Sequence, residues 1–224
     1  MGRYRHLLTD LQGLKKCPEF KDLQEVEQKT LAHYVAQEVG FAEHIEYWFD
    51  GHVKGSEKAL VPILDNDGKL YGHGSVLLAG PVGSGKTGYL SVMLKEVFIR
   101  TSKRFGGPAY QVPGIFLAGC LLLTHDELVT EMHQYDQFSW DELKKVKILL
   151  LDDWLSKTDD SKNFSFDKFY ALIDYRYRNR LTTWISTNVS WKDIKKIPGI
   201  ARIYSRLQDK SWMTYVEVTC KSRR

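Results

Sequence analysis

Residues 78 to 90 read LAGPVGSGKTGYL. Residues 80 to 87 match the pattern GxxxxGK[ST] of a phosphate-binding loop, and an apolar run, SVLLA, leads directly into them. The glycines Gly83 and Gly85 permit the backbone angles that point successive N–H groups at phosphate oxygens. A helix expected to begin at Lys86 adds the partial positive charge of its N-terminus. The stretch therefore predicts a bound nucleoside triphosphate, either ATP or GTP.

The loop also predicts which residues hold the nucleotide. Lys86 would neutralise the β- and γ-phosphates, and Thr87 would be a ligand of Mg²⁺. The expected cofactors are ATP and Mg²⁺. The expected cofactor contacts in the loop are Gly80, Pro81, Val82, Gly83, Ser84, Gly85, Lys86, Thr87 and Gly88. The loop alone does not distinguish hydrolysis of the γ-phosphate from its transfer, because P-loop folds serve both reactions.

A second apolar run, KILLLDDW at residues 147 to 154, ends in two acids. We expect it to form a parallel strand beside the strand of the phosphate-binding loop. Its carboxyl end would deliver Asp152 to Mg²⁺ and Asp153 to the attacking water. A kinase uses a substrate hydroxyl as its acceptor, whereas a second acid at this place is typical of NTPases that activate water. The pair therefore favours hydrolysis over transfer.

A third apolar stretch, LTTWISTN, ends in Asn188. Its neutral amide can hydrogen-bond the γ-phosphate or the attacking water without competing for the proton of that water. An Asn after a strand is also a common turn or helix-cap residue. The expected position of Asn188, one strand beyond the acidic pair, favours the interpretation as a γ-phosphate sensor.

From about residue 56, short apolar runs alternate with amphipathic helical stretches, which is the pattern of a parallel sheet covered by helices. The predicted fold class is therefore α/β, with a five-stranded parallel sheet flanked by helices. Strands are expected at Ser75 to Ala79, Gly119 to Thr124, Lys147 to Leu151, Thr182 to Thr187 and Trp212 to Thr219. Helices are expected at Lys86 to Arg100, Asp126 to Tyr135, Phe166 to Arg180, and Ser190 to Leu207 with an interruption at Pro198.

Two regions follow from this pattern. Residues 56–224 are expected to form the ATPase domain. Residues 1–55 are expected to form a small helical segment, which either packs on the main domain or binds a partner, because such a segment buries little core by itself. The 224 residues, 43% of them hydrophobic, fit one α/β core with a modest appendage.

Composition excludes several classes of protein. No apolar run approaches the roughly 18 residues of a membrane helix, and the N-terminus lacks a signal-peptide pattern. The three cysteines lie far apart, which argues against a disulfide framework and a zinc ribbon. We therefore expect a cytoplasmic protein with no membrane partner.

The charge is unevenly distributed along the chain. The net charge is +4, but residues 175–224 hold twelve Lys and Arg against three Asp and Glu. This basic region could face nucleic acid or the nucleotide of a neighbour, or could be a plain solvated surface. Residues 100–118 combine basic and aromatic side chains, which fits either a loop that binds single-stranded DNA or a surface insertion.

Taken together, these stretches resemble the AAA+ ATPases of the DnaC/DnaI/IstB kind, which are bacterial helicase loaders and transposition helper ATPases. The resemblance covers about residues 56–224. It rests on GSVLLAGPVGSGKTGYL, LLLTHDELVTEM, KILLLDDW, LIDYRYRNRLTTWISTN and RIYSRL. It implies an AAA+ fold of the ASCE type without a C-terminal lid domain. At residues 132–145 initiator-like relatives carry an extra helical element that touches DNA. The segment is short here, and Lys144 and Lys145 could reach a DNA backbone, but a plain helix-to-strand connection is expected.

The resemblance also implies roles for arginines. In these proteins the arginine of the RIxxRL helix acts as a finger on the ATP of the neighbouring subunit, which corresponds to Arg206 here, with Arg202 one turn earlier. A serine-containing turn near the end of the family carries a sensor-2 arginine. That position corresponds to Arg224, or to Arg223 if the register slips. A finger supplied in trans implies a homo-oligomer with head-to-tail ATP interfaces.

The leading interpretation is an oligomeric ATPase that loads a replicative helicase and uses its ATP state to control its grip on single-stranded DNA. An alternative within the same fold is a transposition helper that binds DNA and recruits a transposase. Two other classes stay open. One is a small-molecule P-loop kinase, and the other is a nucleotide-gated adaptor that barely hydrolyses ATP.

Overall fold

The computed structural model describes residues 74–91, 93–94, 119–133, 137–155 and 166–218. Residues 1–55, the basic and aromatic stretch at 100–118 and the terminal Arg223 and Arg224 lie outside these ranges. The roles predicted for them stay predictions.

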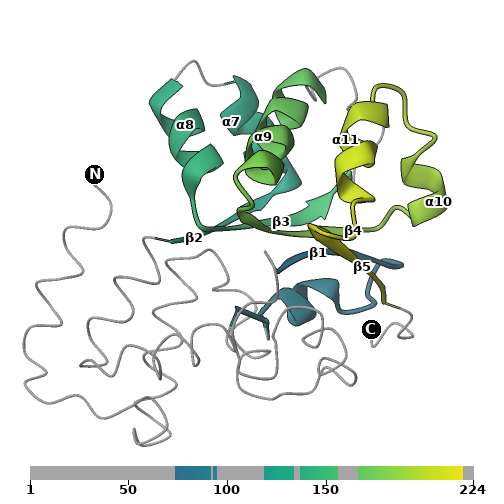
Figure 1. Ribbon diagram of the computed structural model, residues 1–224. Coiled ribbons are helices and arrows are strands. Elements are labelled where there is room, and N and C mark those ends of the chain that lie inside the picture. Colours follow the sequence, from purple (N-terminus) through teal and green to yellow (C-terminus); the bar gives the residue numbers. More distant parts are fainter. Residues whose placement is uncertain (1–73, 92, 95–118, 134–136, 156–165, 219–224) are drawn as a thin grey trace, which may run out of the picture.

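The described strands form one parallel sheet in the order β2-β3-β4-β1-β5 (Figure 1). They are β1 (Ser75–Ala79), β2 (Cys120–Thr124), β3 (Ile148–Trp154), β4 (Thr182–Thr187) and β5 (Met213–Glu217). All neighbouring pairs run parallel. The predicted five-stranded parallel sheet is confirmed, and β1 and β4 have the bounds that the sequence predicted.

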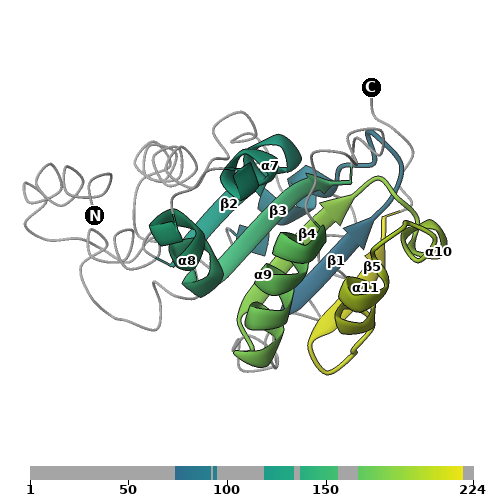
Figure 2. The same cartoon turned by 90° about the horizontal axis from the view of Figure 1, so that it is seen from above.

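The strand order corrects one expectation. Strand β3, which ends in the two acids, does not lie beside β1, because β4 pairs with β1 on one side and with β3 on the other. Asn188, which follows β4, therefore lies between the phosphate-binding loop and the acids and not one strand beyond them. All six residues of β4 are buried, as expected for the central strand of a five-stranded sheet. Figure 2 shows the strands side by side in this order.

Helices cover both faces of the sheet. The helices drawn over one face in Figure 1 are α7 (His125–His133), α8 (Gln137–Lys145), α9 (Phe166–Arg178), α10 (Trp191–Ile194) and α11 (Ala201–Leu207). The helix that begins at residue 86 lies on the other face. The predicted interruption near Pro198 is confirmed, because α10 ends before it and α11 begins after it. Among the described residues, no helix is long and apolar enough to cross a membrane.

Side chains alternate between the two faces of each strand, and both faces are buried. Leu77, Leu149 and Ile185 join Phe169 of α9 and Ile203 of α11 in one apolar core. The intervening strand residues, such as Leu78 and Leu150, are buried too and by the same alternation belong to the opposite face of the sheet.

Residues 132–145 do not form a plain connection, so that expectation was wrong. They contain α8, a helix of nine residues. Leu143 is buried, Trp140 packs against the core, and Lys144 forms an ion pair with Asp141 at 3.2 Å. Trp140 and Leu143 are three residues apart, as are Asp141 and Lys144, so the members of each pair are neighbours on the surface of a helix. Packing of Leu143 and Trp140 therefore stabilises a helix where the sequence suggested a loop.

Arg176 of α9 forms hydrogen bonds both to the end of α8 and to the start of β4. Its side chain is fully buried. The guanidinium donates to the carbonyl oxygens of Lys144 at 3.0 Å and Val146 at 2.8 Å, and to the Thr183 hydroxyl at 2.8 Å. It also donates to the carbonyl oxygen of Thr182. Burial lowers the pKa of Arg176 to about 9, so the group stays charged at neutral pH beside the negative end of the α8 dipole.

Replacing Arg176 with Met removes these hydrogen bonds and leaves buried carbonyl oxygens without their donor. Each buried acceptor left unpaired costs about 1–3 kcal/mol, so we expect the free energy of unfolding to fall by about 3 kcal/mol or more. Urea denaturation followed by circular dichroism measures this change. Arg178→Met is the matched control on the same helix, because the Arg178 side chain is 70% exposed and its ion pair is worth less than about 1 kcal/mol. Equal losses in the two variants would contradict the role assigned to Arg176.

Candidate functional site

The phosphate-binding loop joins β1 to the helix that begins at residue 86. Gly83 and Gly85 have φ angles of 77° and 89°, in the left-handed region that favours glycine. The Ser84 N–H donates to the carbonyl oxygen of Pro81 at 3.2 Å and closes the turn. The loop is therefore built on the two glycines that the sequence singled out.

The first residue of the loop packs closely against the end of β5. A Cβ atom at Gly80 would lie 2.3 Å from the carbonyl oxygen of Val218, which is too short for a contact. The Val218 N–H in turn donates to the carbonyl oxygen of Ala79 at 2.7 Å. On the other side, the Gly80 N–H donates to the carbonyl oxygen of Thr187 at 3.2 Å. The loop thus starts from a point fixed by the strands on both sides of β1.

The Lys86 ammonium lies where the loop meets the end of β4. It donates to the carbonyl oxygens of Gly80 at 2.8 Å and Pro81 at 2.9 Å, and to the side-chain oxygen of Asn188 at 2.7 Å. Burial lowers the pKa of Lys86, and the negative charges of Asp153 and Asp152 oppose that shift. The ammonium is therefore held near both acids and the loop.

The two acids at the end of β3 have different partners. The Thr87 hydroxyl donates to Asp152 Oδ2 at 2.9 Å. The Asn188 amide donates to Asp153 Oδ1. Asp152 therefore lies against the start of the helix after the loop, and Asp153 lies against the residue that follows β4.

The separation of the acids comes from an irregularity in β3. Leu151 pairs with Ile185 and Trp154 pairs with Thr187, so three residues of β3 advance against two of β4. This is the pattern of a β-bulge, which adds one residue and turns the strand locally. Asp153 lies at the bulge with a φ of 55°, an angle that Asp tolerates better than most residues. The side chains of the consecutive residues Asp152 and Asp153 therefore contact different neighbours.

Sequence reasoning missed one polar residue of this site. Ser186 of β4 is buried, and its hydroxyl accepts a hydrogen bond from the Asp153 N–H at 2.8 Å. The same hydroxyl donates to Asp152 Oδ1. The residue occurs inside a strand of apolar and threonine residues, so nothing local to the sequence distinguishes it from a core position.

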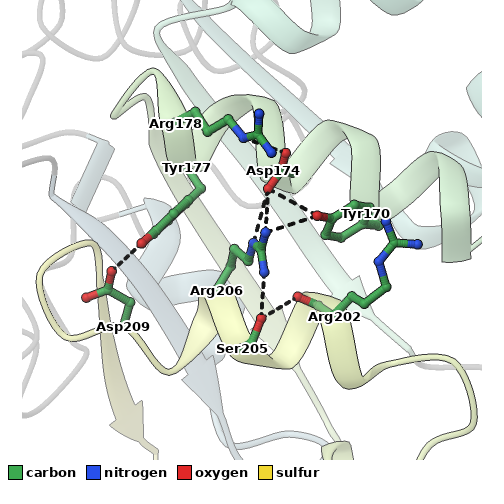
Figure 3. A network of polar contacts seen from close by, with 8 residues as sticks. All are labelled: Tyr170, Asp174, Tyr177, Arg178, Arg202, Ser205, Arg206 and Asp209. Carbon is green, nitrogen blue, oxygen red and sulfur yellow. Dashed lines mark hydrogen bonds and ion pairs between the residues drawn. The ribbon is translucent and has the colours of Figure 1, made fainter.

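The structure does not bring Arg206 into this cluster. Arg206 lies in the last turn of α11, and its guanidinium donates to Asp174 Oδ1 at 3.1 and 2.9 Å and to the Tyr170 hydroxyl at 3.0 Å (Figure 3). Arg202, one turn earlier, stacks over the Tyr170 ring at 3.9 Å and forms a long ion pair with Asp167. The Arg202 side chain is 64% exposed and that of Arg206 is 27% exposed. Both arginines thus lie on the surface that α9 and α11 form together, which we call the α9/α11 face (Figure 3).

The described acids do not build a metal site by themselves. No group of three or more His, Cys, Asp or Glu side chains suited to a metal ion occurs in the described part of the chain. Mg²⁺ in nucleotide-binding proteins usually needs only one or two protein carboxylates, because phosphate oxygens and water complete its coordination. Thr87 and Asp152, which touch each other, fit that pattern of ligands.

A comparison with solved structures finds chains that are similar to this one. A proposed primosome component from Streptococcus pyogenes serotype M3 matches with a TM-score of 0.51 and 19% identity, over 78% of this chain and 81% of that chain. DnaI matches with a TM-score of 0.49 and 19% identity, over 96% and 93% of the two chains. The DnaC helicase loader matches with a TM-score of 0.49 and 18% identity, over 78% and 98%.

A scan of protein-family models finds no match, and a search of curated proteins finds no significant match. At 19% identity the similarity to the primosome component concerns the fold alone. The predicted α/β fold, a five-stranded parallel sheet flanked by helices with a phosphate-binding loop after β1, is confirmed.

Proposed function

We propose that this chain binds ATP with Mg²⁺ and hydrolyses the ATP. One observation carries the proposal. Lys86, Thr87, Asp152, Asp153 and Asn188 come from three distant segments of the sequence and gather through hydrogen bonds at the ends of β1, β3 and β4. Ligands of open parallel sheets bind outside these carboxyl ends.

In this proposal the backbone of residues 80–88 surrounds the phosphates. Lys86 exchanges its contacts with loop carbonyls for contacts with the β- and γ-phosphates. Thr87 and Asp152 supply the oxygen ligands for Mg²⁺, which would neutralise charge on the phosphates when bound. Arg224 is retained as the predicted sensor-2 arginine, with Arg223 as its alternative.

The same proposal assigns the hydrolytic step to the residues beside the loop. Asp153 accepts a proton from the attacking water, and Asn188 orients that water or the γ-phosphate. The hydrogen bond between Asn188 and Asp153, together with that between Asn188 and Lys86, supports a common task for these residues. An acid and an amide paired at this edge favour water activation over transfer to a substrate hydroxyl.

We also propose that copies of the chain assemble head to tail and that Arg206 completes the ATP site of a neighbour. The partly exposed guanidinium of Arg206 on the α9/α11 face supports this role, and Arg202 beside it supplies a second cation. Asp174 is the group with which a phosphate of the neighbour would compete for Arg206. The contact repeats heterologously, so it builds rings or spirals.

The cellular task that we propose is loading of a replicative helicase, with single-stranded DNA as a ligand. The motifs shared with the DnaC/DnaI/IstB group support this assignment. The transposition helper, which would bind DNA and recruit a transposase, is the second candidate because those motifs belong to both.

Changing Asp153 to Asn tests the hydrolytic step. The amide cannot accept the proton of the attacking water, so we expect phosphate release to fall by about 10²- to 10⁴-fold. Binding of a fluorescent ATP analogue should persist, because Lys86 and the loop remain. Asp141→Asn is the control, since that side chain is 43% exposed and lies on α8. ADP formation by the wild type only in the presence of an acceptor, without release of inorganic phosphate, would favour a kinase. Formation of neither ADP nor phosphate would favour the adaptor.

Mixing two inactive variants tests the role of Arg206 in trans. Lys86→Ala removes nucleotide binding and Arg206→Ala removes the finger, so each variant alone should show little phosphate release. In an equal mixture, about a quarter of head-to-tail interfaces combine an intact loop with an intact Arg206. We therefore expect activity to reappear on mixing. An inactive mixture, with light scattering that shows a monomer in the presence of ATP and DNA, would contradict the proposal.

Affinity capture from native lysate tests the partner. The wild-type chain should recover a hexameric helicase, and Lys86→Ala should recover less of it if ATP controls the contact. Recovery of a transposase would instead support the transposition helper. Recovery of neither would contradict both assignments of the partner while leaving the ATPase chemistry untouched.

A further inference from the structure

The bulge at the end of β3 depends on a side chain from the neighbouring strand. In a β-bulge the extra residue is not paired in the ordinary ladder. Here the Asp153 N–H donates to Ser186 Oγ at 2.8 Å. A side-chain oxygen of β4 thus accepts the hydrogen bond at the point where the register between the strands shifts.

The direction of each hydrogen bond at Ser186 is fixed by chemistry. The Asp153 N–H is a donor, so the serine oxygen accepts from it. The carboxylate of Asp152 is an acceptor when ionised, so the serine hydroxyl donates to it. The single serine proton is therefore committed to Asp152, and the oxygen lone pairs are available to the Asp153 backbone.

These two bonds connect the remaining contacts of the site into one chain. Thr87 bonds to Asp152, Asp152 to Ser186, Ser186 to Asp153, and the Asp153 carboxylate to Asn188. Asn188 in turn bonds to Lys86. Ser186 is the link between the acid that faces Thr87 and the acid that faces Asn188.

We infer that Ser186 is a positioning residue that holds Asp152 and Asp153 in their separate directions, so that Asp152 is oriented for Mg²⁺ beside Thr87. The inference rests on the proposed function, since it assigns a role toward the Mg²⁺ of that site. Ser186 is buried and acts through the carboxylate that it bonds, which leaves Asp152 with one oxygen fixed by Ser186 and the other beside Thr87.

A purely structural role for Ser186 makes a different prediction. If the Ser186 hydroxyl only accepted the hydrogen bond of the Asp153 N–H at the bulge, its loss would lower the stability of the fold. The dependence of nucleotide binding on Mg²⁺ would not change. If the hydroxyl orients Asp152, its loss weakens the metal contact specifically. Loss of a residue that orients a metal ligand typically costs 10- to 100-fold in metal affinity or activity.

The experiment measures the affinity of a fluorescent ATP analogue for the full chain, first in EDTA and then in saturating Mg²⁺. The ratio of the two affinities is the Mg²⁺ gain. For Ser186→Ala we expect the Mg²⁺ gain to fall by about 10-fold or more. The affinity in EDTA should stay at the wild-type level, because it depends on the loop and Lys86. A titration of Mg²⁺ at fixed nucleotide gives the same shift independently.

Two further variants and one control distinguish an effect of the Ser186 hydroxyl from an effect of side-chain packing at this position. Ser186→Thr keeps a hydroxyl, so it should recover most of the Mg²⁺ gain. Ser186→Cys replaces the hydroxyl with a thiol, which is a weak donor, so it should also lose the Mg²⁺ gain. It provides the test if Ser186→Ala does not fold. Ser75→Ala is the matched control on β1, because Ser75 is also buried and its hydroxyl oxygen accepts from the Thr183 N–H at 3.0 Å at the start of the strand. We expect its Mg²⁺ gain to equal that of the wild type.

The outcomes separate the inference from the function on which it rests. A wild-type Mg²⁺ gain in Ser186→Ala or Ser186→Cys would overturn the inference and leave the ATPase proposal standing. Equal losses of the Mg²⁺ gain in Ser186→Thr and Ser186→Ala would show that the effect comes from packing. That result would also overturn the inference. A wild-type chain that binds no nucleotide, or binds it equally in EDTA and Mg²⁺, would reject the proposed function itself.

Discussion

Strand β4 pairs with β1 on one side and with β3 on the other, and all six of its residues are buried. The loop that follows β1 and the acids that end β3 belong to strands that do not touch. Residues at the end of β4 contact both the loop and the acids. Asn188 bonds to Lys86 and to Asp153, and Ser186 bonds to Asp152. The geometry of the site consequently depends on the position of β4.

Polar contacts fix β4 at both ends. At its start, Arg176 donates to Thr182 and Thr183, and the Trp184 indole donates to the carbonyl oxygen of Gly74 at 2.7 Å. At its end, Ser186 engages the bulge of β3. Polar groups buried in this way strongly favour one register, since a slip would leave several of them unpaired. Arg176 contacts the start of the same strand whose end carries the side chains beside the loop.

The sequence predicted the elements of this fold well because their signals are local. Apolar runs marked β1 and β4 to the residue, and Gly83 and Gly85 marked the loop. Strand order is a long-range property, so the insertion of β4 between β1 and β3 was missed. The helix α8 was also missed, because its stability comes from the packing of Leu143 and Trp140 and from no strong local signal.

The candidate site divides in the same way. Lys86, Thr87, Asp152, Asp153 and Asn188 were all identified from the strand ends, and the structure brings them together. Ser186 and the bulge were not, because a bulge depends on how two strands meet. No pattern in KILLLDDW states that its two acids point to different neighbours.

Arg206 presents a different physical problem, since its proposed role requires it to exchange partners. Its hydrogen bonds to Asp174 and Tyr170 are partly exposed, and hydrogen bonds to charged groups contribute about 1.5–3 kcal/mol each at most sites. An arginine finger is worth about 10³- to 10⁵-fold in rate, or about 4–7 kcal/mol of transition-state stabilisation. Arg206 makes three such hydrogen bonds, so the two contributions are of similar size in a resting site. In the role that we propose for Arg206, the contact with the phosphate would strengthen as charge develops in the transition state. The contact of Arg206 with Asp174 is therefore compatible with the role that we propose on a neighbour, because charge developing on the phosphate would shift the balance away from Asp174.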